Sequence, residues 1–269
     1  MFETITCACA NASRNCAQSR AACSAPRSFP ARLLALLRYR WQIAPDAPLS
    51  LYPCELVSRN GDTLRQQVLA LGLEWHAPEA LLGNIAEHCV WVNSLVDRIV
   101  SAPLQPLGAV AEPYALWAIE RQPRMVLPCT HPDIVVTDAL ARHERLKLML
   151  LNLGHSFLAE RWLLDARDPG ETVCQAMNDA ALREALETLW RDEVLPVFVG
   201  DGEAAQAQAY LVALRDRLLN PWLEHRLADI ANNHDEKKQR RFRPVIERAE
   251  ALGLEIAQPR LRAALGYMQ

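Results

Sequence analysis

The stretch between residues 144 and 155 is rich in leucine but carries Glu144, Lys147, Asn152 and His155. At about 100° per residue of α-helix, Glu144, Lys147 and His155 fall within roughly 80° of one another, and Asn152 lies about 60° beyond His155. A rise of about 1.5 Å per residue separates Lys147 from His155 by roughly 12 Å along the helix axis. The spacing therefore predicts that all four side chains face one extended, sugar-sized ligand.

Lys147 has leucine or methionine at most neighbouring positions, so its amine is expected either to reach solvent or to be partly desolvated. Desolvation disfavours the ammonium form and lowers the pKa of a lysine from about 10.4 towards neutrality, where the amine can accept and return a proton. Asn152 could then donate a hydrogen bond to a developing alkoxide. The alternative is that Lys147 extends to solvent, Asn152 bonds locally and His155 is an ordinary interior histidine.

The stretch 144–155 is expected to lie in a helix and to be surrounded by other helices, because apolar residues recur at helical spacing through most of the chain after residue 78. Strand signals are few in this part and are limited to residues 124–127 and 134–136. Helices are predicted over residues 79–88, 113–120, 138–164, 179–195, 203–228, 235–252 and 258–267.

The segment before residue 78 predicts a short α/β unit. Apolar residues at helical spacing follow Ser28, and Pro30 stands where a helix tolerates proline, so a helix is predicted from Ser28. The short apolar run 49–54 is typical of a buried strand, and a turn at Asn60 and Gly61 leads into a predicted helix over 63–73. The order helix, strand, helix is typical of the last unit of a parallel sheet.

Composition places the chain among globular proteins and limits its partners. Of its 269 residues, 51% are hydrophobic and 23% charged, and 29 basic against 32 acidic residues leave a net charge of -3. This charge gives no basic footprint for nucleic acid or for an anionic membrane surface. No apolar run approaches the 18 or so residues that a membrane span needs. The expected partners are therefore small molecules, with no nucleic acid and no membrane.

The eight cysteines fall into two groups of four. The first group crowds into the first 23 residues at a spacing unsuited to zinc, so no metal site is predicted. The second group is scattered singly through apolar surroundings, and these cysteines are interpreted as small core residues in a reducing, cytoplasmic compartment. The first group is Cys7, Cys9, Cys16 and Cys23, and the second is Cys54, Cys89, Cys129 and Cys174.

Lys147 followed by Asn152 and His155 resembles the Lys-x4-Asn-x2-His signature of the mannitol dehydrogenase family, a group of metal-independent, NAD-using enzymes that act on polyols and hexuronates. Other short blocks of the sequence also resemble the family and occur in the same order along the chain. Together, these blocks cover roughly residues 26–245. These blocks are residues 54–56 with Asn60 and Gly61, residues 93–100, residues 111–114 with Trp117, Arg217 with Asn220 and Pro221, and residues 230–244.

Within the family, the blocks 28–30, 54–56 and 111–114 look most similar to the tagaturonate reductase (altronate oxidoreductase) branch. Polyol-type members typically have Asp-Asn where this chain has Glu55 and Leu56. The resemblance implies an NAD-dependent alcohol dehydrogenase or ketone reductase that interconverts a keto-hexuronate and its aldonate. The alternatives are a mannitol/fructose-type enzyme, a fructuronate reductase, a catalytically inactive truncated substrate domain, or a helical scaffold for a protein partner. The expected ligand is a sugar acid or a polyol.

The resemblance also implies roles for single residues of the lysine segment. Lys147 would be the general acid/base, Asn152 the partner of the oxyanion and His155 a substrate contact. Glu144 resembles the acid that serves the proton path of the lysine.

Three further residues are implied or proposed as substrate contacts. Asp97 matches a substrate-side aspartate of the family. Arg217 or Lys237 is proposed to hold a uronate carboxylate. The alternative for Arg217 is a surface ion pair, and for Lys237 a basic run on a solvated face.

The expected fold is mainly α, with a large helical substrate domain over residues 99–269 preceded by a truncated Rossmann-type α/β remnant over residues 26–98. Residues 1–25 have no periodic pattern and are expected to be an unmatched, disordered leader. The sequence contains no G-x-G-x-x-G turn for a dinucleotide pyrophosphate, so no cofactor-binding residues are assigned. The chain is expected to be a monomer or to pair with a separate chain that supplies the missing Rossmann half.

Overall fold

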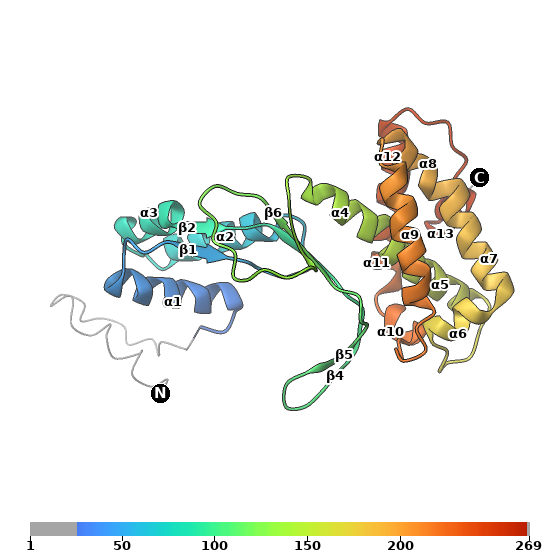
Figure 1. Ribbon diagram of the computed structural model, residues 1–269, viewed down its shortest axis with the longest axis horizontal. Helices are drawn as coiled ribbons and strands as arrows, with labels where there is room; N and C mark the ends of the chain where they lie inside the picture. Colours follow the sequence, from blue (N-terminus) through green and yellow to red (C-terminus); the bar gives the residue numbers. More distant parts are fainter. Residues whose placement is uncertain (1–25, 268–269) are drawn as a thin grey trace. The chain divides into compact units, whose positions relative to one another are not determined.

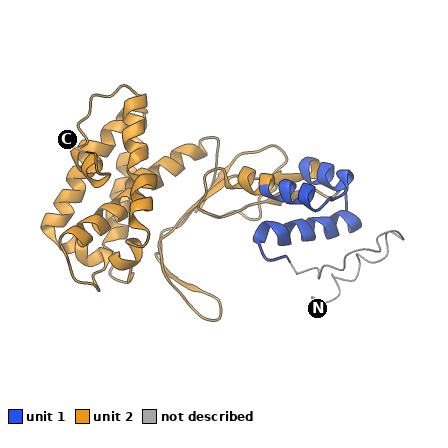
Figure 2. Ribbon diagram, turned by 180° about the vertical axis from the view of Figure 1, so that it is seen from behind, with its two compact units in different colours: residues 1–46, 67–86 blue, residues 47–66, 87–269 orange. Residues whose placement is uncertain are grey.

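The computed structural model describes residues 26–267 (Figure 1). The chain divides into two compact units (Figure 2), which are residues 1–46 with 67–86 and residues 47–66 with 87–269. The predicted leader, with its four cysteines, lies outside the described residues.

The described part of the first unit is helical. Helix α1 (Phe29–Ile43) begins after Ser28, whose hydroxyl accepts a hydrogen bond from the amide of Ala31 at 3.3 Å, and Pro30 lies in its first turn. The later part of α2 (Asn60–Glu74) and most of α3 (Glu79–His88) complete this unit. The helices predicted from Ser28, over 63–73 and over 79–88 are confirmed.

The second unit contains a parallel strand pair. Strand β1 (Leu49–Leu51) pairs with β2 (Cys89–Trp91), and α2 and α3 connect the two strands along the chain. A parallel pair needs such a crossover connection, which is the unit that builds Rossmann-type sheets. The strand predicted in 49–54 is confirmed but ends before Pro53, since a proline cannot donate to a strand ladder.

Five further strands lie between residues 94 and 137, where the sequence predicts one helix, over 113–120, and two short strands, over 124–127 and 134–136. The helix predicted over 113–120 is wrong, because Leu116–Glu120 is the central strand of a three-stranded sheet in which Ala118 and Ile119 are fully buried. The strand predicted over 134–136 is confirmed, whereas 124–127 forms no strand. The strands β3 (Ser94–Asp97), β6 (Leu116–Glu120) and β7 (Ile134–Thr137) form the sheet, and β4 (Val100–Pro103) and β5 (Ala109–Ala111) form a hairpin.

The rest of the second unit is a helical domain around one apolar core. The longest predicted helix, 138–164, is confirmed as α4 (Leu140–Leu146), the π-helical segment η2 (Lys147–Asn152) and α5 (Leu153–Leu164) in direct succession. The predicted helices 203–228 and 235–252 are each divided in two. The remaining elements are α6 (Val173–Asn178), α7 (Ala180–Leu189), η3 (Trp190–Val194), α8 (Leu195–Gly200), α9 (Ala204–Leu218), α10 (Leu227–Ile230), α11 (His234–Arg241), α12 (Arg243–Ala251) and α13 (Pro259–Ala264).

The chain thus combines a Rossmann-type α/β part with a C-terminal helical domain. The mainly α expectation is confirmed in part, because helices predominate but strands lie between residues 89 and 137. All of these strands except the one at 134–137 were missed, because short strands in mixed surroundings carry a weak periodic signal and their pairing depends on distant partners.

The π-helical segment η2 changes the geometry of the lysine segment. A π turn holds more residues than an α turn, so the angles expected for a straight helix do not hold across residues 147–152. Side chains from elsewhere bond carbonyls of this segment: Trp190 Nε1 donates to the Leu150 oxygen at 3.3 Å, and Arg241 Nη1 to the Asn152 oxygen at 3.2 Å. Single π turns are frequent at functional sites.

Gly154 allows the indole of Trp190 to reach the lysine segment. A Cβ at position 154 would lie 2.8 Å from Cζ2 of Trp190, which is fully buried. We therefore predict that Gly154→Ala lowers the free energy of unfolding by about 1–3 kcal/mol, measured by chemical denaturation. Gly83→Ala is the control, because a Cβ on this helical glycine meets no atom within 4 Å. Equal effects of the two substitutions would contradict the packing role of Gly154.

Candidate functional site

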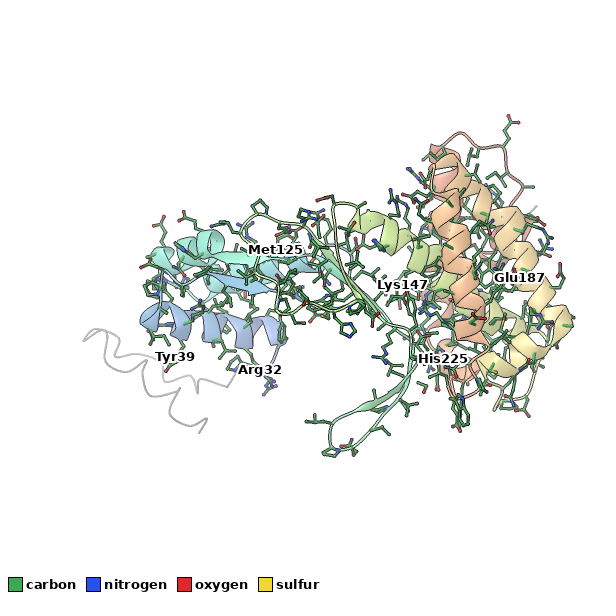
Figure 3. The ribbon with its side chains drawn as sticks, viewed as in Figure 1. Arg32, Tyr39, Met125, Lys147, Glu187 and His225 are labelled. Atoms are coloured by element: carbon green, nitrogen blue, oxygen red, sulfur yellow. The ribbon has the colours of Figure 1, made fainter. Side chains whose placement is uncertain are left out.

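Lys147 opens the π-helical segment and is buried, with 8% of its surface exposed (Figure 3). Its Nζ donates to the backbone oxygen of Val96, at 2.6 Å, and no carboxylate of the described residues forms an ion pair with it. Burial lowers the pKa of Lys147; Arg217 and Arg241 lower it further, and the charge of Asp97 opposes them. The structure therefore favours the desolvated lysine over one extended to solvent.

A buried ion cluster of Arg217, Asp97 and Glu112 lies beside Lys147, and none of the three is more than 6% exposed. Asp97 accepts from Nη2 at 2.9 Å and from Nη1 at 3.2 Å, while Glu112 accepts from Nη2 at 2.8 Å and from Nε at 3.0 Å. The Tyr210 hydroxyl accepts from Nη1 at 3.3 Å and donates to Asp97 at 2.7 Å. All five N–H groups of Arg217 are thus engaged, which leaves none for a ligand carboxylate.

The ion cluster joins segments that are far apart in the sequence. Asp97 ends β3, Glu112 follows β5 and accepts from the amide of Ile99 at 2.6 Å, and Arg217 lies in the last turn of α9. The ring of Tyr114 lies against the guanidinium, with 4.0 Å between its centroid and Cζ. Asp97 and Arg217, both predicted as substrate contacts, are therefore brought together as partners of each other.

Removing Arg217 would leave two buried carboxylates without their common partner. We predict that Arg217→Met lowers the free energy of unfolding by about 3–5 kcal/mol, measured by chemical denaturation. Arg191→Met is the matched control, since the Arg191 side chain is 59% exposed and pairs with surface carboxylates; its effect should stay below about 1 kcal/mol. A loss for Arg217→Met as small as that of the control would contradict the structural role of the cluster.

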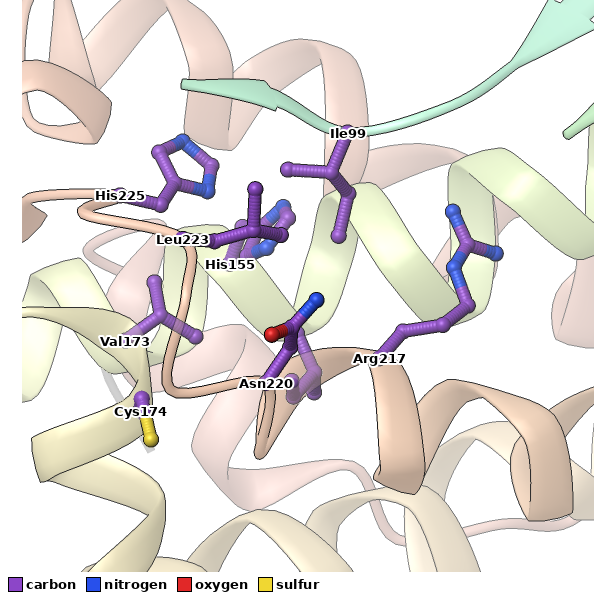
Figure 4. Close-up of a pocket in the computed structure, with 9 residues that line it drawn as sticks. Ile99, His155, Val173, Cys174, Arg217, Asn220, Leu223 and His225 are labelled. Atoms are coloured by element: carbon purple, nitrogen blue, oxygen red, sulfur yellow. The ribbon is translucent and has the colours of Figure 1, made fainter. Parts of the chain in front are cut away.

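His155 is buried and its ring meets that of His225 edge to face, with 4.8 Å between the ring centroids. Nε2 of His155 and Nδ1 of His225 are buried without a hydrogen-bond partner among the described residues. Figure 4 shows the two rings close together in a small pocket, with Arg217 at its other end. The other residues that line this pocket are Ile99, Val173, Cys174, Leu218, Asn220, Leu223.

Burial disfavours the charged form of both imidazoles. Burial, followed by the charges around it, lowers the pKa of His155 well below 6.5, and burial is also the main cause that lowers the pKa of His225. Sequence reasoning did not select His225, because a single histidine in a loop carries no distinguishing pattern.

The depressed pKa of His155 makes stability depend on pH. Below pH 6.5 the unfolded state binds more protons at this position than the folded state, so stability falls as pH falls through that value. We predict that, between about pH 7 and 5, the free energy of unfolding falls less in His155→Gln than in the wild type. An unchanged slope in His155→Gln would refute this contribution.

Asn152 and Glu144 are both half-buried. The side-chain amide of Asn152 has no hydrogen bond to any described residue, so it is available to a ligand. Glu144 accepts a hydrogen bond from the Ser58 hydroxyl at 3.3 Å. Within residues 26–267, no hydrogen bond or ion pair joins Glu144 to Lys147.

The loops after the two parallel strands are tied together by Asn60. Its Nδ2 donates to the backbone oxygens of Pro53 and Ser94 at 2.9 and 2.8 Å, and its Oδ1 accepts from the Ser94 amide at 2.9 Å. Gly61 permits this approach, because a Cβ there would lie 2.7 Å from the carbonyl carbon of Val92. The carboxyl ends of parallel strands form the edge where α/β sheets bind their ligands.

The four scattered cysteines were predicted to be core residues. This prediction is correct for Cys89, which is buried, and wrong for Cys54 and Cys129, which are exposed; Cys174 is intermediate.

Within the described ranges, no group of three or more His, Cys, Asp or Glu side chains is placed to hold a metal ion. None of the helices that the structure describes is long and apolar enough to cross a membrane.

Comparison with known families gives two matches that follow one another along the chain. The mannitol dehydrogenase Rossmann domain matches residues 5–128, and the mannitol dehydrogenase C-terminal domain matches residues 139–267. The first match begins within the predicted leader and continues past residue 98, where sequence reasoning places the domain boundary.

Similar curated proteins include two altronate oxidoreductases. That of Halalkalibacterium halodurans is 30% identical over 240 residues, covering 82% of this chain and 46% of the relative. That of Klebsiella pneumoniae (strain 342) is 29% identical over 264 residues, covering 90% of this chain and 53% of the relative. The chain thus spans about half the length of the curated relatives it matches.

Two solved structures share the fold. Pseudomonas fluorescens mannitol 2-dehydrogenase, in a ternary complex with NAD and D-mannitol, aligns with a TM-score of 0.68 at 20% identity, covering 90% of this chain and 50% of that one. A substrate-free D-sorbitol dehydrogenase aligns with a TM-score of 0.66 at 19% identity, covering 85% and 49%. Since both domains of one family match in order along nearly the whole sequence, the chain belongs to the mannitol dehydrogenase family.

Proposed function

We propose that this chain is an NAD-dependent oxidoreductase that interconverts a keto-hexuronate and its aldonate, of the tagaturonate and altronate type, with Lys147 as general acid/base. The observation that carries the proposal is a buried lysine whose amine, in the part of the chain that the structure describes, bonds only a backbone carbonyl. Membership of the family supports the reaction class, and the similar altronate oxidoreductases support the substrate class.

Lys147 would transfer the proton of the reaction. In reduction its ammonium form gives a proton to the developing alkoxide, and in oxidation its neutral amine takes the hydroxyl proton. The carbonyl of Val96 holds Nζ in place, and the free amide of Asn152 donates to the same substrate oxygen. His155 contacts the substrate. Glu144, half-buried beside Ser58, is proposed to exchange protons between the lysine and solvent.

NADH, when bound, supplies the hydride to the carbonyl carbon of the substrate. Asn60 fixes the loops at the carboxyl edge of the parallel strands, which is the edge where dinucleotides bind in such sheets. The residues that would contact the pyrophosphate are not assigned, since the sequence has no G-x-G-x-x-G turn.

Asp97 and Arg217 are proposed to position Lys147 rather than to touch the substrate. Asp97 adjoins Val96, whose carbonyl accepts from Nζ, and the donors of Arg217 are all engaged. The negative charge of Asp97 also opposes the effect of burial on the pKa of Lys147. This balance favours a lysine that can both gain and lose a proton.

The test of the substrate class is NADH oxidation by the purified chain, followed by absorbance, with tagaturonate, fructuronate and fructose supplied in turn. Turnover with tagaturonate is expected. Turnover with fructose alone would favour the mannitol/fructose-type alternative. No turnover from a folded sample would favour a catalytically inactive substrate domain.

The role of the lysine is tested by Lys147→Met, which keeps the apolar stem and removes the amine. We predict a fall in kcat of about 10²–10⁴-fold, as expected for the loss of a general acid/base. In the wild type, kcat/KM for altronate oxidation should rise with pH, because the neutral amine is the active form, and its midpoint should lie below 10.5. Unchanged turnover in Lys147→Met, in a sample with the wild-type melting profile, would refute the role.

A further inference from the structure

Three cations near His155 and His225 lack a carboxylate partner among the described residues: Lys147 is buried, and Lys237 and Arg241 are partly buried. Lys147 donates to the Val96 oxygen, Lys237 to the Ile230 oxygen at 2.7 Å, and Arg241 to an oxygen of the lysine segment. Arg241 lies close enough to both lysines to add to the effect of burial in lowering the pKa of each. Unpaired cations in partly buried positions are costly, so this grouping points to an anionic ligand.

Arg241 is held in place with one edge free. It lies at the end of α11, and its Nη1 donates to the Asn152 oxygen at 3.2 Å and to the Ser156 hydroxyl at 2.8 Å. Its Nε and Nη2 have no hydrogen bond to any described residue. This edge presents two parallel N–H groups, which is the geometry that binds both oxygens of a carboxylate. Arg217, with all five N–H groups engaged, offers no such edge.

The two histidines provide further polar groups in the same region. Nε2 of His155 and Nδ1 of His225 are buried and have no hydrogen-bond partner within residues 26–267, although such atoms are almost always hydrogen-bonded in folded proteins. Their rings are in contact, and both histidines feel the charge of Arg241. His155 directly precedes Ser156, which Arg241 contacts. A ligand with several oxygens would satisfy these nitrogens.

We infer that the free edge of Arg241 binds the carboxylate of a sugar acid, with Lys237 adding positive charge and His155 and His225 bonding the neighbouring oxygens of the ligand. The inference rests on the proposed function and specifies its substrate subsite. It assigns to Arg241 the carboxylate that sequence reasoning gave to Arg217 or Lys237. A neutral polyol would leave the cations uncompensated, so this subsite selects acids over polyols.

The test is calorimetric titration of the chain with altronate and with altritol, the hexitol that has a hydroxymethyl group in place of the carboxylate. The wild type should bind altronate more tightly. Arg241→Gln should weaken altronate binding by about 10- to 100-fold, as expected for a charge-assisted hydrogen-bond pair, and leave altritol binding unchanged. Arg241→Lys, which keeps the charge but not the planar fork, should lose at least several-fold for altronate alone.

Arg240→Gln is the matched control, because Arg240 is the neighbouring residue on the same helix, is 73% exposed and pairs with Glu236. It should change neither affinity. The inference is overturned if the wild type does not prefer altronate, or if Arg241→Gln weakens both ligands equally or no more than Arg240→Gln does. If Arg241→Gln does not fold, unchanged altronate affinity in Arg241→Lys overturns it.

Kinetics separate this inference from the proposed function. If altronate is oxidised and Lys147→Met abolishes turnover while Arg241→Gln leaves KM unchanged, the function stands and the subsite is wrong. If the binding preference depends on Arg241 but turnover is absent or insensitive to Lys147→Met, the subsite stands and the proposed function is wrong.

Discussion

The buried pairing of Arg217 with Asp97 and Glu112 is the interaction on which the rest of the site depends. It joins residues 105 and 120 positions apart in the sequence. Two carboxylates can be buried together here only because one guanidinium bonds both of them. Val96 adjoins Asp97 and offers its carbonyl to Lys147, so the ion cluster also fixes where the amine lies. Structural stability and the geometry of the proposed proton transfer therefore rest on the same side chains.

Much of the fold could be predicted from the sequence where a local pattern decides it. Helices such as 138–164 carry a long apolar period, and the strand at 49–51 lies between turn formers. Residues 116–120 could not be predicted in this way, because Leu, Trp and Ala also suit a helix and the strand forms through its partners β3 and β7. The π turn at Lys147–Asn152 depends equally on distant residues, since Trp190 and Arg241 bond its carbonyls.

The sequence could predict which residue types form the candidate site, but not which side chains are hydrogen-bonded to each other. Lys147, Asn152 and His155 stand out as polar residues in an apolar helix, and burial of the lysine follows from its neighbours. The sequence gives no sign that Arg217 would use every donor on Asp97, Glu112 and Tyr210, because that saturation is a property of three-dimensional packing. Arg241 lies in a run of basic residues, where only the contacts distinguish the one with a free edge from its solvated neighbours.

The most direct test of the central claim, that burial makes the amine of Lys147 easier to deprotonate than that of an ordinary lysine, is its titration by NMR. Lys147, Lys237 and Lys238 are the three lysines of the chain, so labelling lysine ε-carbons with carbon-13 gives three resonances, and Lys147→Arg assigns one of them. Burial predicts a midpoint for Lys147 below 10.5. A midpoint at or above 10.5 would contradict a desolvated lysine and, with it, the proposed general acid/base.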